Sequence, residues 1–200
     1  MKLAVLVSGS GTNLQAILDA EKRRELGGTV ALVLSNVAGV KALERAAQAG
    51  VPTRVLSHRE HASREAYDRA LVGALREAKV ELVALAGFMR IVTGTFLDAF
   101  PGQVVNIHPS LLPAFPGMHA QRQALAHGVR LTGCTVHFVD GGLDSGPILS
   151  QAAVPVLDGD DEARLTARIL VEEHKLYPAA LRAIAEGRVS VSGRRVIIRS

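Results

Sequence analysis

The sequence predicts an α/β protein built on a doubly wound, mostly parallel sheet with an antiparallel C-terminal portion. The first 100 residues alternate short apolar runs with stretches of helical periodicity, and this order is typical of parallel sheets with right-handed crossovers. Two β-rich segments, 132–139 and 148–156, then follow each other with no helical pattern between them. We therefore expect these two segments to pair as an antiparallel hairpin.

Four strands and three helices are expected in the first half of the chain. The segment 80–86 is nearly all apolar, as a central parallel strand covered on both faces should be. Ser63 stands where an N-cap would open the third helix, and Gly50 closes the second. The strands are expected at about 3–7, 29–34, 52–56 and 80–86, and the helices at about 14–18, 40–49 and 63–78.

The second half is expected to begin with a strand over 104–108. The proline-rich segment 110–119 predicts a rigid, ordered loop. Acidic residues at 158–161 suit the N-terminal dipole of a long helix, which Pro178 is expected to kink or interrupt. The remaining elements are expected at about 95–99, 120–126 and 162–186 for helices and 189–198 for a small terminal hairpin.

Length and composition indicate one globular domain spanning 1–200, with 48% apolar and 21% charged residues. The formal net charge is +4, but the arginines are scattered, aromatic residues make up 4%, and tryptophan is absent. We therefore expect no nucleic-acid partner. The N-terminal apolar run is only five residues long, which favours a strand over a signal peptide. No apolar run is long enough to cross a membrane, so no membrane partner is expected.

The cysteine and histidine content limits the disulfides and metal sites that the chain could form. Cys134 is the only cysteine, which excludes an intramolecular disulfide and favours a reducing, cytoplasmic setting. The histidines are dispersed, and Cys134 has no cysteine partner at the spacing of a zinc site. We therefore expect a chain that binds no metal.

The central candidate for chemistry is the stretch that contains Asn106 and His108. Side chains alternate along a strand, so these two residues point the same way, and Pro109 then ends the strand. An amide donor beside an imidazole could hold a developing oxyanion and move a proton. The alternative from the residues alone is a core histidine with an asparagine at a turn.

A second candidate is the loop that follows the first strand. Gly9 and Gly11 let the backbone approach a ligand, and the helix that begins near Thr12 and Asn13 offers free N–H groups to a phosphate. A dinucleotide is disfavoured because Leu14 replaces the third glycine of the usual motif. We expect a cradle for one terminal phosphate, and a tight turn without a ligand is the alternative.

Other ligand contacts are expected beyond the carboxyl ends of the strands. The loop after 80–86 is more apolar than a solvent-exposed loop should be, which suggests the wall of an apolar pocket or plain core packing. Arg64 stands at a helix start and is free to reach a ligand. The segment 140–147 combines three glycines, two carboxylates and a proline, which predicts a shaped loop between two strands. The apolar residues of the first loop are Phe88, Met89, Ile91 and Val92.

Four stretches together resemble the folate-dependent phosphoribosylglycinamide formyltransferases of purine synthesis. They are Gly9-Ser10-Gly11-Thr12-Asn13, Ala86-Gly87-Phe88-Met89-Arg90-Ile91, Asn106-Ile107-His108-Pro109-Ser110-Leu111-Leu112-Pro113 and Leu143-Asp144-Ser145-Gly146-Pro147. The likeness runs from the first strand through Tyr177-Pro178 and implies a Rossmann-like formyltransferase fold. Departures are mild: Ser10 and Thr12 stand where the family often has Asn and Ser, and Asp140-Gly141-Gly142 is an unusual pterin-side loop.

The resemblance also implies roles for individual residues. The catalytic trio corresponds to Asn106, His108 and Asp144. Ribonucleotide contacts correspond to Gly11, Thr12, Asn13 and Glu173, and folate contacts to Arg64, Met89, Arg90, Ile91, Val92 and Asn106. It implies a phosphate-binding half at about 1–100 and a catalytic, folate-binding half at about 101–200 of one formyltransferase domain.

The implied activity is transfer of the formyl group of 10-formyltetrahydrofolate to the amino group of 5-phosphoribosylglycinamide, by a monomer or homodimer without a metal. A carboxylate at Asp144 would favour the charged form of His108. Two further enzymes remain open: a formyltetrahydrofolate hydrolase, whose relatives carry an extra N-terminal domain, and a methionyl-tRNA formyltransferase, whose relatives carry a C-terminal domain. The first expected strand begins at residue 3, which counts against the hydrolase, and the expected elements leave no room for the C-terminal domain of the tRNA enzymes. A non-catalytic ribonucleotide-binding module is the fourth alternative.

Overall fold

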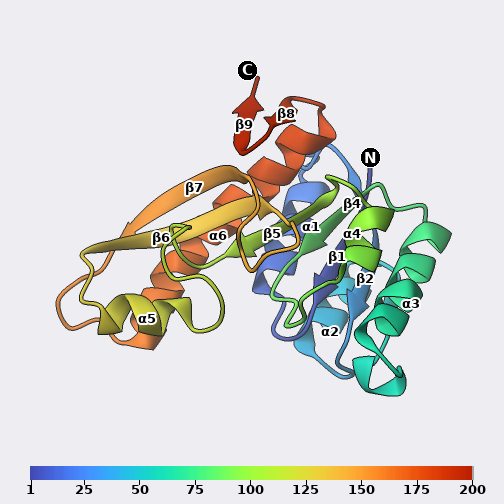
Figure 1. The fold of residues 1–200 in the computed structure, drawn as a ribbon, viewed down its shortest axis with the longest axis horizontal. Helices are drawn as coiled ribbons and strands as arrows, with labels where there is room; N and C mark the ends of the chain where they lie inside the picture. The colour runs from blue at the N-terminus through green and yellow to red at the C-terminus, as the bar shows by residue number, and fades with distance from the viewer. Residues whose placement is uncertain (200) are drawn as a thin grey trace.

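The computed structural model describes residues 1–199 and contains a seven-stranded sheet in the order β3-β2-β1-β4-β5-β6-β7 (Figure 1). A separate two-stranded sheet, β8-β9, lies at the C-terminal end of the described chain. The strands are β1 Lys2–Val7, β2 Thr29–Ser35, β3 Thr53–Val55, β4 Leu82–Leu85, β5 Val104–His108, β6 Leu131–Phe138, β7 Ile148–Pro155, β8 Val189–Ser192 and β9 Arg195–Ile198. The helices are α1 Thr12–Lys22, α2 Lys41–Gln48, α3 Arg64–Glu77, α4 Gly94–Ala99, α5 Ala120–Ala126 and α6 Glu162–Ala185, with a 3₁₀ turn at His58–Glu60.

The pairing confirms the predicted fold class. Strands β3, β2, β1, β4 and β5 run parallel, whereas β5, β6 and β7 pair antiparallel. The predicted hairpin of β6 and β7 is present, and Pro155 lies on the edge strand, where its missing N–H costs no ladder bond. Chain order reverses between β1 and β4, so the carboxyl ends of these two strands form the crevice where ligands bind in such sheets.

Two helical layers cover the sheet. In β1, Leu3, Val5 and Val7 pack in the core cluster that includes residues of α1, α2 and α6. Residues Ala4 and Leu6 face the other way, into a cluster with residues of α3 and α4. The alternation along one strand therefore supplies both cores, as expected of a buried parallel strand.

Several boundaries differ from the sequence-based expectation. Helix α6 continues through Pro178, so the expected alternative that the proline interrupts the helix is wrong. The neighbouring Tyr177 is fully buried, and its hydroxyl lies within hydrogen-bonding distance of the carbonyls of Leu85 and Val105, so packing against the sheet holds the helix at this point. The 3₁₀ turn at His58–Glu60 was not predicted.

Helix starts follow the predicted chemistry. The Ser63 hydroxyl accepts a hydrogen bond from the Ala66 N–H, which confirms the predicted N-cap of α3. At the start of α6 the Asp161 carboxylate accepts from the Arg164 N–H. Within residues 1–199, no helix combines the length and the apolar character needed to span a bilayer.

Candidate active site

The site lies at the carboxyl edge of the sheet, where three loops are tied together. The hydroxyl of Ser8, at the end of β1, donates to the side-chain oxygen of Asn36 and accepts from the Met89 N–H at 2.8 Å. Ser8 therefore joins the loops that follow β1, β2 and β4. The predicted phosphate loop and the predicted apolar wall consequently border one region.

Helix α2 donates hydrogen bonds to the backbone carbonyls of the predicted phosphate loop. The Ala42 N–H donates to the Gly9 carbonyl at 3.1 Å, and Arg45 Nε donates to the Ser10 carbonyl at 3.0 Å. Gly11 caps α1 in a left-handed conformation, with φ of 70°. A Cβ at Gly11 would lie 2.6 Å from the Cβ of Ala42, so this glycine is required by contact with α2 as well as by its backbone.

Gly11→Ala is expected to lower stability and to weaken ribonucleotide binding. The left-handed backbone alone costs about 1–2 kcal/mol, and displacement of the loop from Ala42 adds to it. We expect KM for the ribonucleotide to rise about tenfold more than KM for the folate. The control is Gly9→Ala, whose Cβ meets nothing within 4 Å and whose melting temperature should stay unchanged. Equal increases in both KM values would contradict the assignment of this loop.

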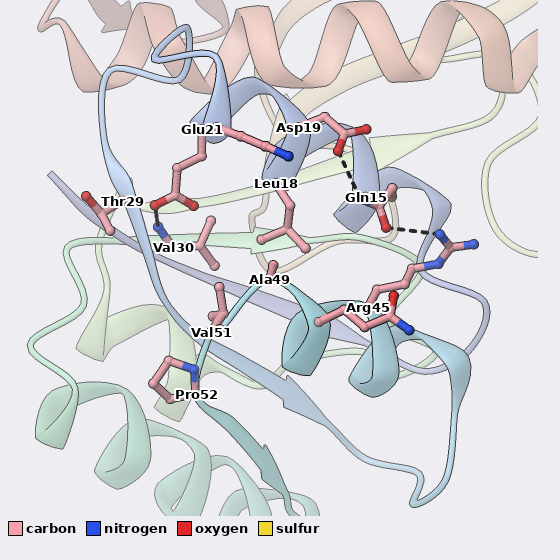
Figure 2. A pocket seen from close by; sticks show the side chains of 13 residues that line it. Gln15, Leu18, Asp19, Glu21, Thr29, Val30, Arg45, Ala49, Val51 and Pro52 are labelled. Carbon is pink, nitrogen blue, oxygen red and sulfur yellow. Dashed lines mark hydrogen bonds between the residues drawn. The ribbon is translucent and has the colours of Figure 1, made fainter.

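A hollow of about 680 Å³ lies between α1 and α2, away from the predicted site residues. Figure 2 shows Arg45 and Gln15 at one end of this hollow and the Glu21–Val30 contact at the other. A second hollow, of about 370 Å³, shares Gln15 and Arg45 and is also lined by Thr12. Apart from Thr12 in the second hollow, none of the predicted site residues lines either hollow, so neither hollow coincides with the predicted catalytic trio.

Glu173 from α6 meets the phosphate loop. Asn13 Nδ2 donates to Glu173 Oε2 at 2.7 Å across 160 positions of sequence, which brings together two predicted ribonucleotide contacts from opposite halves of the chain. Glu173 is only 4% exposed. Burial raises the pKa of its carboxyl above the ordinary value, and the hydrogen bond from Asn13 offsets only part of that effect.

Glu173→Gln is expected to stabilise the unliganded protein while weakening ribonucleotide binding. A carboxyl with a raised folded-state pKa contributes stability below its unfolded pKa, about 4.3, and that stability is lost as pH rises through the folded pKa. At neutral pH the buried charge is therefore a cost, which glutamine removes while keeping an acceptor for Asn13. We expect a gain on the order of 1 kcal/mol, or about 2–4 °C in Tm.

The gain should shrink as the assay pH approaches 4, which thermal melts over a pH series would reveal. Glu172→Gln is the matched control, because Glu172 is less buried and pairs with Lys175 at the surface. A Glu173→Gln variant with no gain at neutral pH, or with the same gain at every pH, would refute the idea that its buried charge is destabilising.

The histidine of the predicted trio is buried between two acceptors. His108 Nε2 lies 2.9 Å from the Phe115 carbonyl oxygen, and Nδ1 lies 3.4 Å from Asp144 Oδ2. The same carboxylate oxygen accepts from the Gly117 N–H at 2.8 Å. Because a carbonyl and a carboxylate only accept hydrogen bonds, a ring with both nitrogens protonated satisfies both neighbours.

Asn106 completes the predicted trio, and a histidine that the sequence analysis did not single out lies beside it. Asn106 pairs with His137 across β5 and β6, and the Asn106 amide nitrogen lies 3.3 Å from His137 Nε2. His137 Nε2 is also 3.7 Å from Asp144 Oδ1. The β-alternation of 132–139 placed His137 in a strand, but only the pairing register brings it to Asn106.

The loop between β6 and β7 is shaped by its own polar groups. Asp140 accepts hydrogen bonds from the Gly142 N–H and the Ser145 hydroxyl. Asp144 has a left-handed backbone, with φ of 47°. A Cβ at Gly146 would overlap the Phe138 carbonyl oxygen, so the glycine lets this loop close against the end of β6.

The predicted folate contacts after β4 include two exposed apolar side chains and one that is buried in the core. Met89 is 68% and Ile91 59% exposed, whereas Val92 packs in the core. Arg64 Nη2 donates to the Ile91 carbonyl at 2.9 Å, which fixes the start of α3 against this loop. Arg90 is half-buried at the same place.

Comparison with known proteins identifies the family. A family model described as formyl transferase matches residues 1–181. Phosphoribosylglycinamide formyltransferase of Escherichia coli K12 is 48% identical over 191 residues, which cover 96% of this chain and 90% of that protein. The trifunctional purine biosynthetic protein adenosine-3 of Drosophila pseudoobscura is 53% identical over 188 residues, and the match covers 93% of this chain but only 14% of that protein's length.

A solved structure agrees with these sequence relatives. The crystal structure of glycinamide ribonucleotide transformylase 1 from Symbiobacterium toebii matches with a TM-score of 0.99 and 55% identity, covering 100% of this chain and 94% of that chain. The likeness thus extends over sequence and fold alike. The chain therefore belongs to the formyl transferase family.

Proposed function

We propose that the chain transfers the formyl group of 10-formyltetrahydrofolate to the amino group of 5-phosphoribosylglycinamide in purine biosynthesis. The observation that carries the proposal is the 48% identity to the Escherichia coli phosphoribosylglycinamide formyltransferase over 90% of that enzyme's length. The names of these relatives favour this activity over hydrolysis of the formyl-folate and over formylation of methionyl-tRNA.

The contacts of the trio support the chemistry. As the primary amine attacks the formyl carbon, the formyl oxygen gains negative charge and a proton must leave the attacking nitrogen. The Asn106 amide donates to that oxygen, and protonated His108 adds positive charge beside it. Asp144 lies next to His108 Nδ1, where its negative charge faces the ring that carries positive charge in this step. Protonated His108 is suited to give its proton to the leaving folate nitrogen as the bond from that nitrogen to the formyl carbon breaks, and the neutral ring can then take up the proton that the attacking nitrogen loses.

The residues proposed to hold the ribonucleotide and the folate have chemistry that suits each substrate. Backbone N–H groups at the start of α1 suit the phosphate of the ribonucleotide, with Gly11, Thr12, Asn13 and Glu173 holding that substrate. Met89 and Ile91 expose apolar surface that the folate ring system and benzoyl group would cover, while Arg64 and Arg90 suit its carboxylates. Val92 supports this surface from the core.

The proposed cellular location is supported by the cysteine content of the chain rather than by the comparisons. The lone Cys134 is buried and unpaired, which supports a cytoplasmic location. Among residues 1–199, no three His, Cys, Asp or Glu side chains are grouped as metal ligands. A monomeric or homodimeric state, a single domain over 1–200, and the absence of metal and nucleic-acid partners stay predictions.

The test is an activity assay with 10-formyltetrahydrofolate and each acceptor in turn. We expect rapid formylation of 5-phosphoribosylglycinamide, with water and methionyl-tRNA reacting far more slowly. Release of formate without any acceptor would support the hydrolase instead. Binding of the ribonucleotide without turnover of either substrate would support a non-catalytic binding module.

A further inference from the structure

His137 is a buried titratable residue that the proposed mechanism leaves without a role. It is 2% exposed and lies on β6 opposite Asn106, so the two side chains share one face of the sheet. The inference below rests on the proposed function, because it assigns His137 a part in formyl transfer.

The contacts of the ring fix the state of both its nitrogens. His137 Nδ1 lies 2.9 Å from the Phe138 carbonyl oxygen, which only accepts, so Nδ1 carries a hydrogen. Burial lowers the pKa of His137, His108 acts with burial, and the Phe138 carbonyl, Asp144 and Asp140 act to raise the pKa. The lowered pKa favours the neutral ring, and a neutral ring whose one hydrogen is on Nδ1 has a bare lone pair at Nε2.

A bare Nε2 determines which way the Asn106 amide points. The amide nitrogen of Asn106 lies 3.3 Å from this lone pair and donates one hydrogen to it. If the amide were reversed, its oxygen would face the lone pair, and two acceptors would be in contact. With one N–H on His137, the second N–H of the same amide is available to a ligand.

We propose that His137 is a positioning residue that holds the Asn106 amide with its donor group toward the formyl oxygen. Without this contact, the amide can rotate and present its oxygen to the formyl oxygen, which repels it. Asp144 does not compete with Asn106 for His137 Nε2. Its Oδ1 is 3.7 Å from Nε2, and a neutral ring has no hydrogen on that nitrogen to donate to a carboxylate.

The backbone at the end of β6 holds the Phe138 carbonyl in place, and this carbonyl is the acceptor that keeps a hydrogen on His137 Nδ1. The Phe138 N–H donates to the Pro147 carbonyl at 2.9 Å, so both sides of the loop are tied where β6 ends. Gly146 packs against the Phe138 carbonyl, where a Cβ would overlap it. The acceptor for Nδ1 is therefore fixed by backbone rather than by a flexible side chain.

The first test is a double-variant cycle with His137→Leu and Asn106→Ala. His137→Leu should lower kcat about tenfold or more, below the ~10²–10³-fold cost of losing an oxyanion donor, with both KM values unchanged. In the Asn106→Ala background, His137→Leu should cost nothing further, because the residue acts through Asn106. An equal fold loss in both backgrounds would overturn the proposal.

His137→Gln is the rescue variant, since its side-chain oxygen can accept from Asn106, and its kcat should stay within a few-fold of the wild type. A rescue variant as slow as His137→Leu would count against the proposal.

The second test needs neither turnover nor a variant. In ¹⁵N NMR of the unliganded wild type, the His137 ring should show a protonated Nδ1 and a bare Nε2 throughout neutral pH. A protonated Nε2 would overturn the assignment even if every variant folds poorly. A wild type that transfers no formyl group to the ribonucleotide would overturn the proposed function as well, whereas additive losses in an active enzyme overturn only the role of His137.

Discussion

His108→Ala should lower kcat by about 10²–10⁴-fold, the range for loss of a general acid–base group, while KM for each substrate stays within a few-fold. The ring lies between the Phe115 carbonyl and Asp144, so its removal deletes the proton carrier and the positive charge beside the formyl oxygen. Steady-state kinetics with each substrate varied in turn would measure this split. A variant with near-normal turnover would make His108 a structural residue.

Asn106→Ala should also lower kcat, by about 10²–10³-fold for one lost oxyanion donor. The combined His108→Ala and Asn106→Ala variant should lose less than the product of the single losses, because the two residues act on the same developing charge. His127→Ala serves as the comparison, since this exposed histidine follows α5 outside the trio and touches the site only through packing of its ring against Phe115. Its kcat should stay within a few-fold of that of the wild type.

The periodic elements could be predicted from sequence because their signals are local. The alternation of apolar runs and helical patterns gave the parallel sheet, and the β6–β7 hairpin follows from two β-rich segments in succession. Asn106 and His108 were recognisable because both lie on one short strand and alternate with Ile107. Such inferences need only the geometry of a strand.

The contacts that set the chemistry could not be predicted, because they depend on register and on loop paths. The Asn106–His137 pair depends on how β6 registers with β5, and 31 positions separate the two residues. The contact of the Phe115 carbonyl with His108 depends on the path of a proline-rich loop. Likewise, the steric need for Gly11 arises from Ala42 on another helix, whereas the motif alone suggested only a close approach to phosphate.

Resemblance supplied what local patterns could not. Nothing in the spacing of α6 marks Glu173, yet it reaches Asn13 across the whole chain. The likeness to a family implied that both residues contact one substrate, and the structure brings their side chains together. By contrast, the continuity of α6 through Pro178 depends on packing against the sheet, which neither the helix pattern nor the motif contains.

Asp144→Asn is expected to lower kcat by about 10²-fold or more with little change in either KM. Asparagine keeps the size of the side chain and an oxygen for the Gly117 N–H, and it tolerates the left-handed backbone at this position. What it removes is the negative charge next to His108 Nδ1. Thermal melts should therefore show a nearly unchanged fold, which separates a loss of charge from a loss of structure.

The pH dependence of kcat distinguishes this role from simple loop support. Without the carboxylate, the positive charge that His108 carries during transfer loses its partner at Nδ1, so the loss of rate should persist across the pH profile. The pKa of His137, already lowered by burial, should fall further because Asp144 acts to raise it. Histidine NMR titrations of wild type and variant would follow both rings. If Asp144→Asn keeps its rate at every pH, Asp144 serves only to anchor Gly117, and the chemistry depends on Asn106 and His108 alone.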